Sequence, residues 1–340
     1  MFFPKYQLTS KLLNNLTQIE RLYGQLEALR VPKKLELNLE RNNLIQSAYV
    51  SNSIEGNPLS LPEVTNLLLG GRVPVNRDEK EVKNYFEILK SLDNYISQPL
   101  SLTLINEVHQ KLLTGVDDKI AGQIRNKRVV VGHYEDEQGK MAVNVKHEPP
   151  AHDRAAIETQ LQDLLNWTET NQEVPPLLKI GSFHHQFVYI HPFEDGNGRV
   201  CRLLTALNFL KNNYQINKYF VLDDYYDIDR LQYSDKLNSA DKGDKTEWLE
   251  YFTDGVTYSL QSALGKAKSA METVSVKERL SPRETEVLEI FKTKNEFTSM
   301  DLAQELRVTR QQAHQLLSNL VDKGFVKKQG STKSSYYVLK

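Results

Sequence analysis

The chain has 340 residues, a mass of 39.1 kDa and a formal net charge of −1, with 39% hydrophobic and 26% charged residues. That length suffices for two or three domains, and the composition is typical of a soluble globular protein. The near-neutral charge gives the whole molecule no electrostatic preference for nucleic acid or membrane. The single cysteine, Cys201, excludes an intrachain disulfide and a four-cysteine zinc site.

The sequence contains no apolar run of about 18 residues, so we expect no membrane-spanning helix. Its first ten residues lack a basic segment leading into an apolar core, so no secretory signal is expected. Sparing use of cysteine agrees with a reducing compartment. We therefore expect a cytoplasmic protein.

Amphipathic stretches dominate the chain and predict a mainly α protein. A first helix is expected over residues 12–29 and a second over 35–54, ended by the breaker set Gly56, Asn57 and Pro58. Further helices are predicted over residues 61–69, 79–97, 103–113, 153–171, 177–190 and from 202 to about 269. Residues 127–145 differ, because two β-branched runs around a Gly-containing turn predict a hairpin.

The most informative segment is residues 191–202, HPFEDGNGRVCR, which joins two apolar helices. Its proline and two glycines break helix, so the second helix begins close to Gly198. A helix N-terminus offers unpaired N–H groups to an anion. Arg199 and Arg202 share one face of that first turn and oppose the helix dipole, so a polyphosphate is expected there.

Two further side chains of this loop suit phosphate chemistry. The Asp195 carboxylate can hold Mg²⁺ with phosphate oxygens completing its coordination shell. The His191 imidazole can take a proton near neutral pH. The segment therefore predicts attack by a hydroxyl on a nucleotide phosphate.

Residues 191–202 resemble the Fic signature H-x-F-x-[DE]-G-N-G-R-x-x-R at every defined position. The resemblance implies a Fic-type helical bundle with a β-hairpin flap, and transfer of AMP from ATP to a Ser, Thr or Tyr hydroxyl of a target protein. It makes His191 the general base, Asp195 the Mg²⁺ ligand and Phe193 the anchor of the loop. The nucleotide-binding residues it implies are Gly196, Asn197, Gly198, Arg199, Val200, Cys201, Arg202 and Tyr233.

The second helix ends with a segment similar to the [ST]-x-x-x-E-[GN] inhibitory motif of Fic proteins. Ser51 and Glu55 occupy its defined positions and, four residues apart, can face the same way. The resemblance implies that Glu55 pairs with Arg202 in place of the γ-phosphate. The chain is therefore expected to inhibit itself through its N-terminal region.

The resemblance extends to the hairpin and to the region after the active loop. It places docking of the target protein on a flap near Val130–His133 and puts Tyr233 against the adenine. Asp241 stands nearby where relatives often have Asn, which leaves its contact open. The remaining histidines receive structural interpretations, with His133 and His147 on the flap surface and His184 and His185 in packing or a structural hydrogen bond.

Residues 280–340 predict three helices and a hairpin and are similar to a winged helix-turn-helix. From Val276 onward, 12 Lys/Arg stand against 8 Asp/Glu, a net charge of +4, and Arg307 and Arg310 flank the start of the third helix. DNA binding is one reading, and a protein-interaction or homodimer module is the other. The expected domains are an N-terminal region (1–100), a Fic core (101–269), a linker (270–279) and this unit (280–340).

Three alternatives to AMP transfer stay open at the level of sequence. The same site in relatives transfers phosphate, UMP or phosphocholine, or it could remove AMP from a target. From a different class, the chain could be a DNA-binding transcriptional regulator that senses nucleotide. Because sensing needs neither His191 nor Asp195, their presence favours the enzyme.

Overall fold

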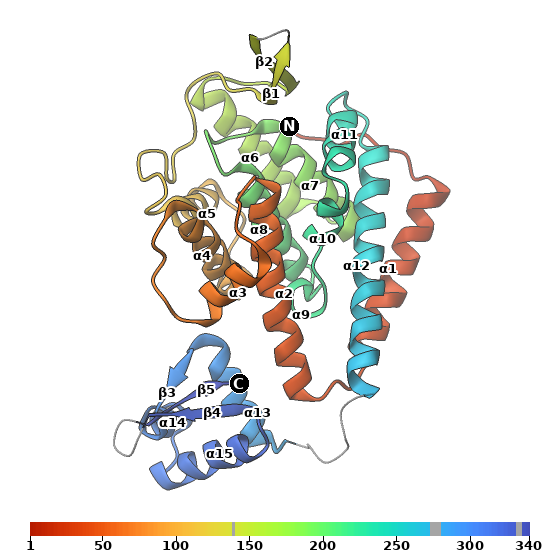
Figure 1. Cartoon of the computed structure of the whole chain (residues 1–340). Helices are drawn as coiled ribbons and strands as arrows, with labels where there is room; N and C mark the ends of the chain where they lie inside the picture. Colours follow the sequence, from red (N-terminus) through yellow and green to blue (C-terminus); the bar gives the residue numbers. More distant parts are fainter. Residues whose placement is uncertain (138–139, 273–279, 331–334) are drawn as a thin grey trace. The chain divides into compact units, whose positions relative to one another are not determined.

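The computed structural model describes residues 1–137, 140–272, 280–330 and 335–340 (Figure 1), without side chains at 133–144, 217, 272 and 293. It divides into unit 1, Met1–Leu29 with Leu39–Gly265, and unit 2, Arg30–Asn38 with Lys266–Lys340. The expected linker, residues 270–279, lies largely outside the described residues. None of the helices in the described ranges is both long and apolar enough to cross a bilayer.

Unit 1 is built from helices, as the sequence predicts. Short polar residues cap several of them, because a side-chain oxygen accepts an otherwise unpaired N–H of the first turn. Thr9, Asn76, Ser101 and Asp153 do so for α1, α4, α5 and α6. The helices that end or lie in unit 1 are α1 (Ser10–Ala28), α2 (Lys33–Ile54), α3 (Leu61–Leu69), α4 (Arg77–Lys90), the 3-10 helix η1 (Leu92–Tyr95), α5 (Leu102–Leu113), α6 (Arg154–Thr170), α7 (Pro176–Ile190), α8 (Asn197–Lys211), α9 (Ile216–Tyr219), α10 (Asp223–Ile228), α11 (Arg230–Ala240) and α12 (Thr246–Glu272).

Helices α7 and α8 lie in the middle of unit 1 (Figure 1), and nearly all their residues are buried. A glycine lets α12 approach α7 closely, because a Cβ at Gly181 would lie 2.8 Å from Leu249 and 2.9 Å from Phe252. Trp248 of α12 donates its ring N–H to the Gly181 carbonyl at 2.7 Å. Helix α1 packs along α12, where Asn15 donates to Thr253 at 3.0 Å. The α7–α8 junction therefore rests on a rigid core.

The predicted hairpin is present between α5 and α6. Strands β1 (Val131–Glu137) and β2 (Lys140–His147) pair antiparallel, with Gly132 opposite Val145 and an irregularity between Val131 and Gly132. The hairpin begins and ends a few residues later than the range expected from β-branched runs. It forms a two-stranded sheet without further strands in the described part of unit 1.

Unit 2 has the predicted order of three helices and a hairpin. Capping boxes open its helices, with Ser281 and Glu284 at α13 and Thr298 and Asp301 at α14. A short strand, β3, pairs with β5, which the sequence did not indicate, and the sheet order is β3-β5-β4. Its elements are α13 (Pro282–Thr293), β3 (Glu296–Phe297), α14 (Ser299–Leu306), α15 (Arg310–Asp322), β4 (Val326–Gln329) and β5 (Tyr336–Leu339).

Candidate active site

The loop between α7 and α8 is held in one shape by its own residues. Asn197 closes it, because its side chain accepts from the Phe193 N–H at 2.8 Å and donates to the Phe193 carbonyl at 2.9 Å. Phe193 is fully buried, as expected of the anchor, and its ring stacks on His109 of α5 at 3.7 Å. His109 also contacts the Asp195 carbonyl at 3.1 Å. Sequence reasoning missed His109, which has no motif of its own.

Gly198 and Arg202, in the first turns of α8, form an anion-binding cradle, and the Glu55 carboxylate fills it. Gly196, with φ of 76°, starts the helix without a side-chain cap. A Cβ at Gly198 would lie 2.1 Å from Glu55 Oε1, so only glycine leaves room for that oxygen. Arg202 donates through Nη2 to Glu55 Oε1 at 2.6 Å and through Nε to Ser51 Oγ at 2.6 Å. The structure thus brings together Ser51, Glu55, Gly198 and Arg202.

Arg202 is a buried cation, and the Glu55 carboxylate stabilises its charge. Its side chain is 2% exposed, whereas that of Glu55 is 35% exposed. Although burial works against the charge, the nearby Glu55 carboxylate raises the pKa of Arg202. An arginine buried in this way requires an anionic partner.

Arg199 has hydrogen-bonding capacity that its neighbours do not use. The residue is 3% exposed, yet its Nε and Nη1 atoms have no hydrogen-bond partner among the described residues. Glu81 and Asp195 each lie within ion-pair distance, at 3.2 Å. Nη1 makes the ion pair with Glu81, so Nε is the atom left with neither a hydrogen bond nor an ion-pair contact among the described residues. Because buried polar atoms normally have partners, Nε indicates a place for an additional acceptor.

His191 ends α7 in the left-handed region, with φ of 49°. Its Nδ1 contacts the Val188 carbonyl at 3.3 Å, which makes Nδ1 the protonated nitrogen and leaves Nε2 as the acceptor. Burial, followed by the charge of His147, lowers the pKa of His191 to about 4. The imidazole is therefore neutral at pH 7 and able to accept a proton.

Asp195 has a partly solvated carboxylate, 42% exposed. One oxygen accepts from the Gly196 N–H at 2.5 Å and from Arg199 at 3.2 Å, and the other lies 3.3 Å from Arg77 Nη2. In the described parts of the chain, no group of three or more His, Cys, Asp or Glu side chains is arranged so that it could hold a metal ion. A hard cation would fit here with one carboxylate from the protein and the remaining oxygens from a polyphosphate.

Three residues predicted to bind nucleotide have buried side chains. Val200 and Cys201 are fully buried, and the Cys201 thiol donates to the His184 carbonyl at 3.3 Å. The Tyr233 ring stacks on Tyr226 at 4.3 Å, and its hydroxyl lies 2.9 Å from His184 Nε2. The prediction that these residues contact nucleotide stays a prediction.

The interpretation of His184 and His185 as structural is confirmed. Both are buried, and His185 Nε2 lies 2.9 Å from Asp241 Oδ1. The expectation that His147 lies on the flap surface is wrong, because its side chain is 9% exposed and its Nδ1 lies 2.7 Å from Asp241 Oδ2. Asp241 thus joins two histidines. The side chain of His133 lies outside the described residues.

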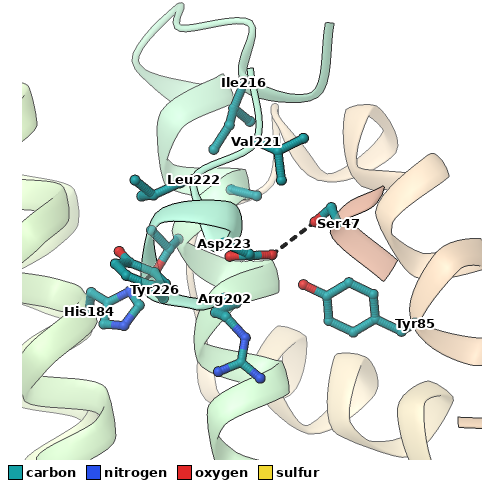
Figure 2. Close-up of a pocket in the computed structure, with 11 residues that line it drawn as sticks. Ser47, Tyr85, His184, Arg202, Ile216, Val221, Leu222, Asp223 and Tyr226 are labelled. Atoms are coloured by element: carbon teal, nitrogen blue, oxygen red, sulfur yellow. Dashed lines mark hydrogen bonds between the residues drawn. The ribbon is translucent and has the colours of Figure 1, made fainter. Parts of the chain in front are cut away.

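A small cavity of about 10 Å³ is lined by Arg202, Asp223 and Ser47, among other residues. Such a volume holds about one water molecule and is far too small for a nucleotide. Asp223 of α10 faces Ser47 of α2 across it and accepts a hydrogen bond at 2.9 Å (Figure 2). Burial raises the pKa of Asp223 to about 6, against the effect of the neighbouring Arg202. Helix α2 is therefore tied to α8 and α10 by polar contacts.

Fold and site together define a helical protein whose anion cradle, at a helix N-terminus, is filled by its own glutamate. Residues 99–208 match the model of the Fic/DOC family. The matched stretch runs from just before α5 into α8 and includes the loop between α7 and α8.

Two curated relatives are protein adenylyltransferases. Fic-1 of Caenorhabditis elegans is 28% identical over 252 residues, 71% of this chain and 46% of the relative. Fic of Culex quinquefasciatus is 28% identical over 265 residues, 73% of this chain and 48% of the relative. The chain thus spans less than half the length of these relatives.

Solved structures share the fold. A Fic family protein from Desulfovibrio desulfuricans G20 aligns with a TM-score of 0.67 at 24% identity, over 100% of this chain and 98% of that one. Residues 134–508 of Fic-1 from C. elegans align with a TM-score of 0.61 at 24% identity, over 76% of this chain and 73% of that one. The Fic-type helical fold with its hairpin is therefore confirmed.

Proposed function

We propose that this chain is a protein adenylyltransferase that moves AMP from ATP to a hydroxyl side chain of a target protein and inhibits itself through Glu55. The observation that carries the proposal is the Glu55 carboxylate against Gly198 and Arg202, an anion in a cradle built for one. The unpartnered Nε of Arg199 supports a larger anion with more oxygens. The curated relatives are named adenylyltransferases, which supports ATP as the anion that binds and as the donor of AMP.

In the reaction, Nε2 of His191 takes the proton of the target hydroxyl as the oxygen attacks the α-phosphorus of ATP. The bond from that phosphorus to the bridging oxygen breaks, and pyrophosphate leaves. Arg199 and Arg202 stabilise the charge on the phosphates, and the first N–H groups of α8 contribute the positive end of the helix. A neutral His191 is the form that this step needs, since only the unprotonated nitrogen can act as base.

Asp195 is the residue that would hold Mg²⁺. The ion would neutralise phosphate charge when it is bound. The carboxylate lies against the guanidinium groups of Arg77 and Arg199. These contacts hold Asp195 at the mouth of the cradle.

Autoinhibition follows from mutual exclusion in the cradle. Ser51 and Glu55 supply three oxygens to Arg202, two from Ser51 and one from Glu55. A phosphate cannot share the space next to Gly198 with Glu55 Oε1. ATP therefore binds productively only after the end of α2 has moved away.

The target is proposed to dock along the flap. Val130, just before β1, is 41% exposed, and β1 and β2 form a two-stranded sheet to which an extended peptide could add by main-chain hydrogen bonds. Such docking would select targets that present an extended backbone. It would place the hydroxyl of the target side chain next to His191.

The test is transfer of label from ATP labelled on the α-phosphate, with Glu55→Gly and Glu55→Gly/His191→Ala proteins. The single variant is expected to label itself or a protein in cell extract with a bound AMP, detected by mass spectrometry, and the double variant to lose at least 100-fold, about the contribution of a general base. Label from the γ-phosphate or from UTP instead would assign another transferred group. ATP binding without any label would assign a sensor and refute the enzyme.

A matched control separates the loss of the Glu55 carboxylate from the general effect of a Glu→Gly substitution. Glu27→Gly changes the same residue type on the exposed side of α1. This control should label no more than the unchanged protein. Equal activity in all three proteins would refute inhibition by Glu55.

A further inference from the structure

The flap is tied at both ends to the helix that carries the catalytic base. Before the flap, Arg125 donates through Nε to the His191 carbonyl at 2.7 Å and through Nη2 to the Ile190 carbonyl at 3.2 Å. At its far end, His147 bonds through Nε2 to the Tyr189 carbonyl at 2.9 Å. The segments that enter and leave the hairpin therefore both hydrogen-bond to the end of α7, at the successive carbonyls of residues 189–191.

The partners of His147 determine its protonation. Its Nδ1 lies 2.7 Å from the Asp241 carboxylate, and its Nε2 faces the carbonyl of Tyr189. An ionised carboxylate and a carbonyl can only accept, so both ring nitrogens must donate. The ring is thus an imidazolium, and its positive charge at the C-terminus of α7 is favoured by the helix dipole.

Asp241 is fixed from the other side by a neutral histidine. Its Oδ1 accepts from His185 Nε2 at 2.9 Å. His185 Nδ1 in turn accepts from Lys245 Nζ at 2.5 Å, which makes Nε2 the only protonated nitrogen of that ring. Asp241 is therefore an ionised bridge between the flap and the core.

We propose that His147 and Asp241 form a pH-dependent clamp that positions the flap relative to His191. Its effect on rate rests on the proposed function, whereas its protonation does not. Both are positioning residues, since neither would touch substrate. A flap displaced by about 1 Å would misalign the target hydroxyl, which can cost 100-fold in rate.

The direction of the pH dependence follows from the charges around the clamp. Burial favours the neutral ring, but the bond and charge of Asp241 outweigh it and raise the pKa of His147 above 6.5. The other groups that face His147 are Arg125 and His191, and those that face Asp241 are His185, Lys245 and Tyr189. The cation exists below the raised pKa, so the clamp weakens as pH rises through that value.

The His147→Gln substitution separates the effect of the imidazolium charge from the effect of the hydrogen-bond geometry. The glutamine amide group supplies two N–H donors at every pH, so it can bond both Asp241 and the Tyr189 carbonyl without titrating. In the Glu55→Gly background, self-labelling should fall at alkaline pH, and His147→Gln should abolish that fall. His147→Leu should label roughly tenfold more slowly, or worse, at every pH.

A surface histidine supplies the control, and a spectroscopic measurement separates the clamp from the enzyme. His152→Gln, at a side chain 47% exposed, should keep the parent's pH profile. The NMR titration of the His147 ring should give a pKa above 6.5 that falls in Asp241→Asn. A ring that titrates at or below 6.5, or a His147→Gln protein that keeps the alkaline fall, would overturn the clamp. Absence of labelling in every protein would refute the proposed function, and the NMR titration would still decide the clamp.

Discussion

Replacing Glu55 should raise the affinity of the protein for ATP by an amount that the structure sets. Arg202, with a side chain 2% exposed, donates to the Glu55 carboxylate at 2.6 Å. A hydrogen bond between charged groups contributes about 1.5–3 kcal/mol net. Because bound ATP must displace this contact, Glu55→Gly should lower the apparent Kd by about 10- to 150-fold.

Two further substitutions separate the two ways in which Glu55 lowers the affinity for ATP, through its charge and through the volume that it occupies. Glu55→Gln removes the charge but keeps an oxygen in the cradle, so it should recover only part of the affinity. Glu55→Asp keeps the charge on a side chain one methylene shorter and should bind ATP more tightly than the parent but less tightly than the glycine variant. Isothermal titration calorimetry with ATP and Mg²⁺ in the His191→Ala background measures binding without turnover.

The stability of the unliganded variants offers an independent check. Without Glu55, the carboxylate that still acts on the buried Arg202 cation is that of Asp223. The Tm of unliganded Glu55→Gly should therefore lie below that of the parent, and ATP should raise it by more. Equal Kd values in the parent and Glu55→Gly proteins would refute the reasoning, because they would show that the carboxylate does not compete with phosphate.

Other expected outcomes concern stability and unit 2. Gly181→Ala should destabilise unit 1 by about 1–3 kcal/mol in urea unfolding, since its Cβ would lie 2.8 Å from Leu249. Burial lowers the pKa values of His109 and His185 to about 4, below their unfolded values, so stability should fall as pH drops from 6.5 towards 4, as measured by urea unfolding over a pH series. If α15 reads DNA, random duplex should bind at low salt, measured by fluorescence anisotropy, and Arg310→Ala should weaken that binding; no binding at low salt would exclude this role.

Helical periodicity predicted most of unit 1 closely, because apolar spacing records which face is buried. The helix expected over residues 61–69 is α3, with the same bounds. The helix expected over 79–97 is wrong in its second half, where α4 ends at Lys90 and η1 takes over. There the backbone N–H of Ser91 bonds to the Ile88 carbonyl, a tighter turn that apolar spacing does not distinguish from α-helix.

The sequence could indicate the loop and the Glu55 segment that contacts it because each is a contiguous motif. It could not indicate partners that meet only in the folded chain. Asp241 and His147 are 94 positions apart, and nothing near either residue marks the pairing. His109 sits in an apolar stripe of α5, where a histidine reads as ordinary packing, and its role appears only through its stack on Phe193.

The spacing of polar residues on α2 suits the proposed inhibition, which has to be both specific and reversible. Ser47, Ser51 and Glu55 recur every four residues, so they share one face of the helix or its continuation, and they bond Asp223 and Arg202. Polar contacts of this kind exchange for water or phosphate with a small net change in free energy, whereas an apolar face would resist separation. Because Arg202 requires an anion in either state, the proposed exchange of Glu55 for ATP would leave no buried charge unpaired. In this proposal the occupant of the cradle changes, and the charge of Arg202 stays compensated throughout.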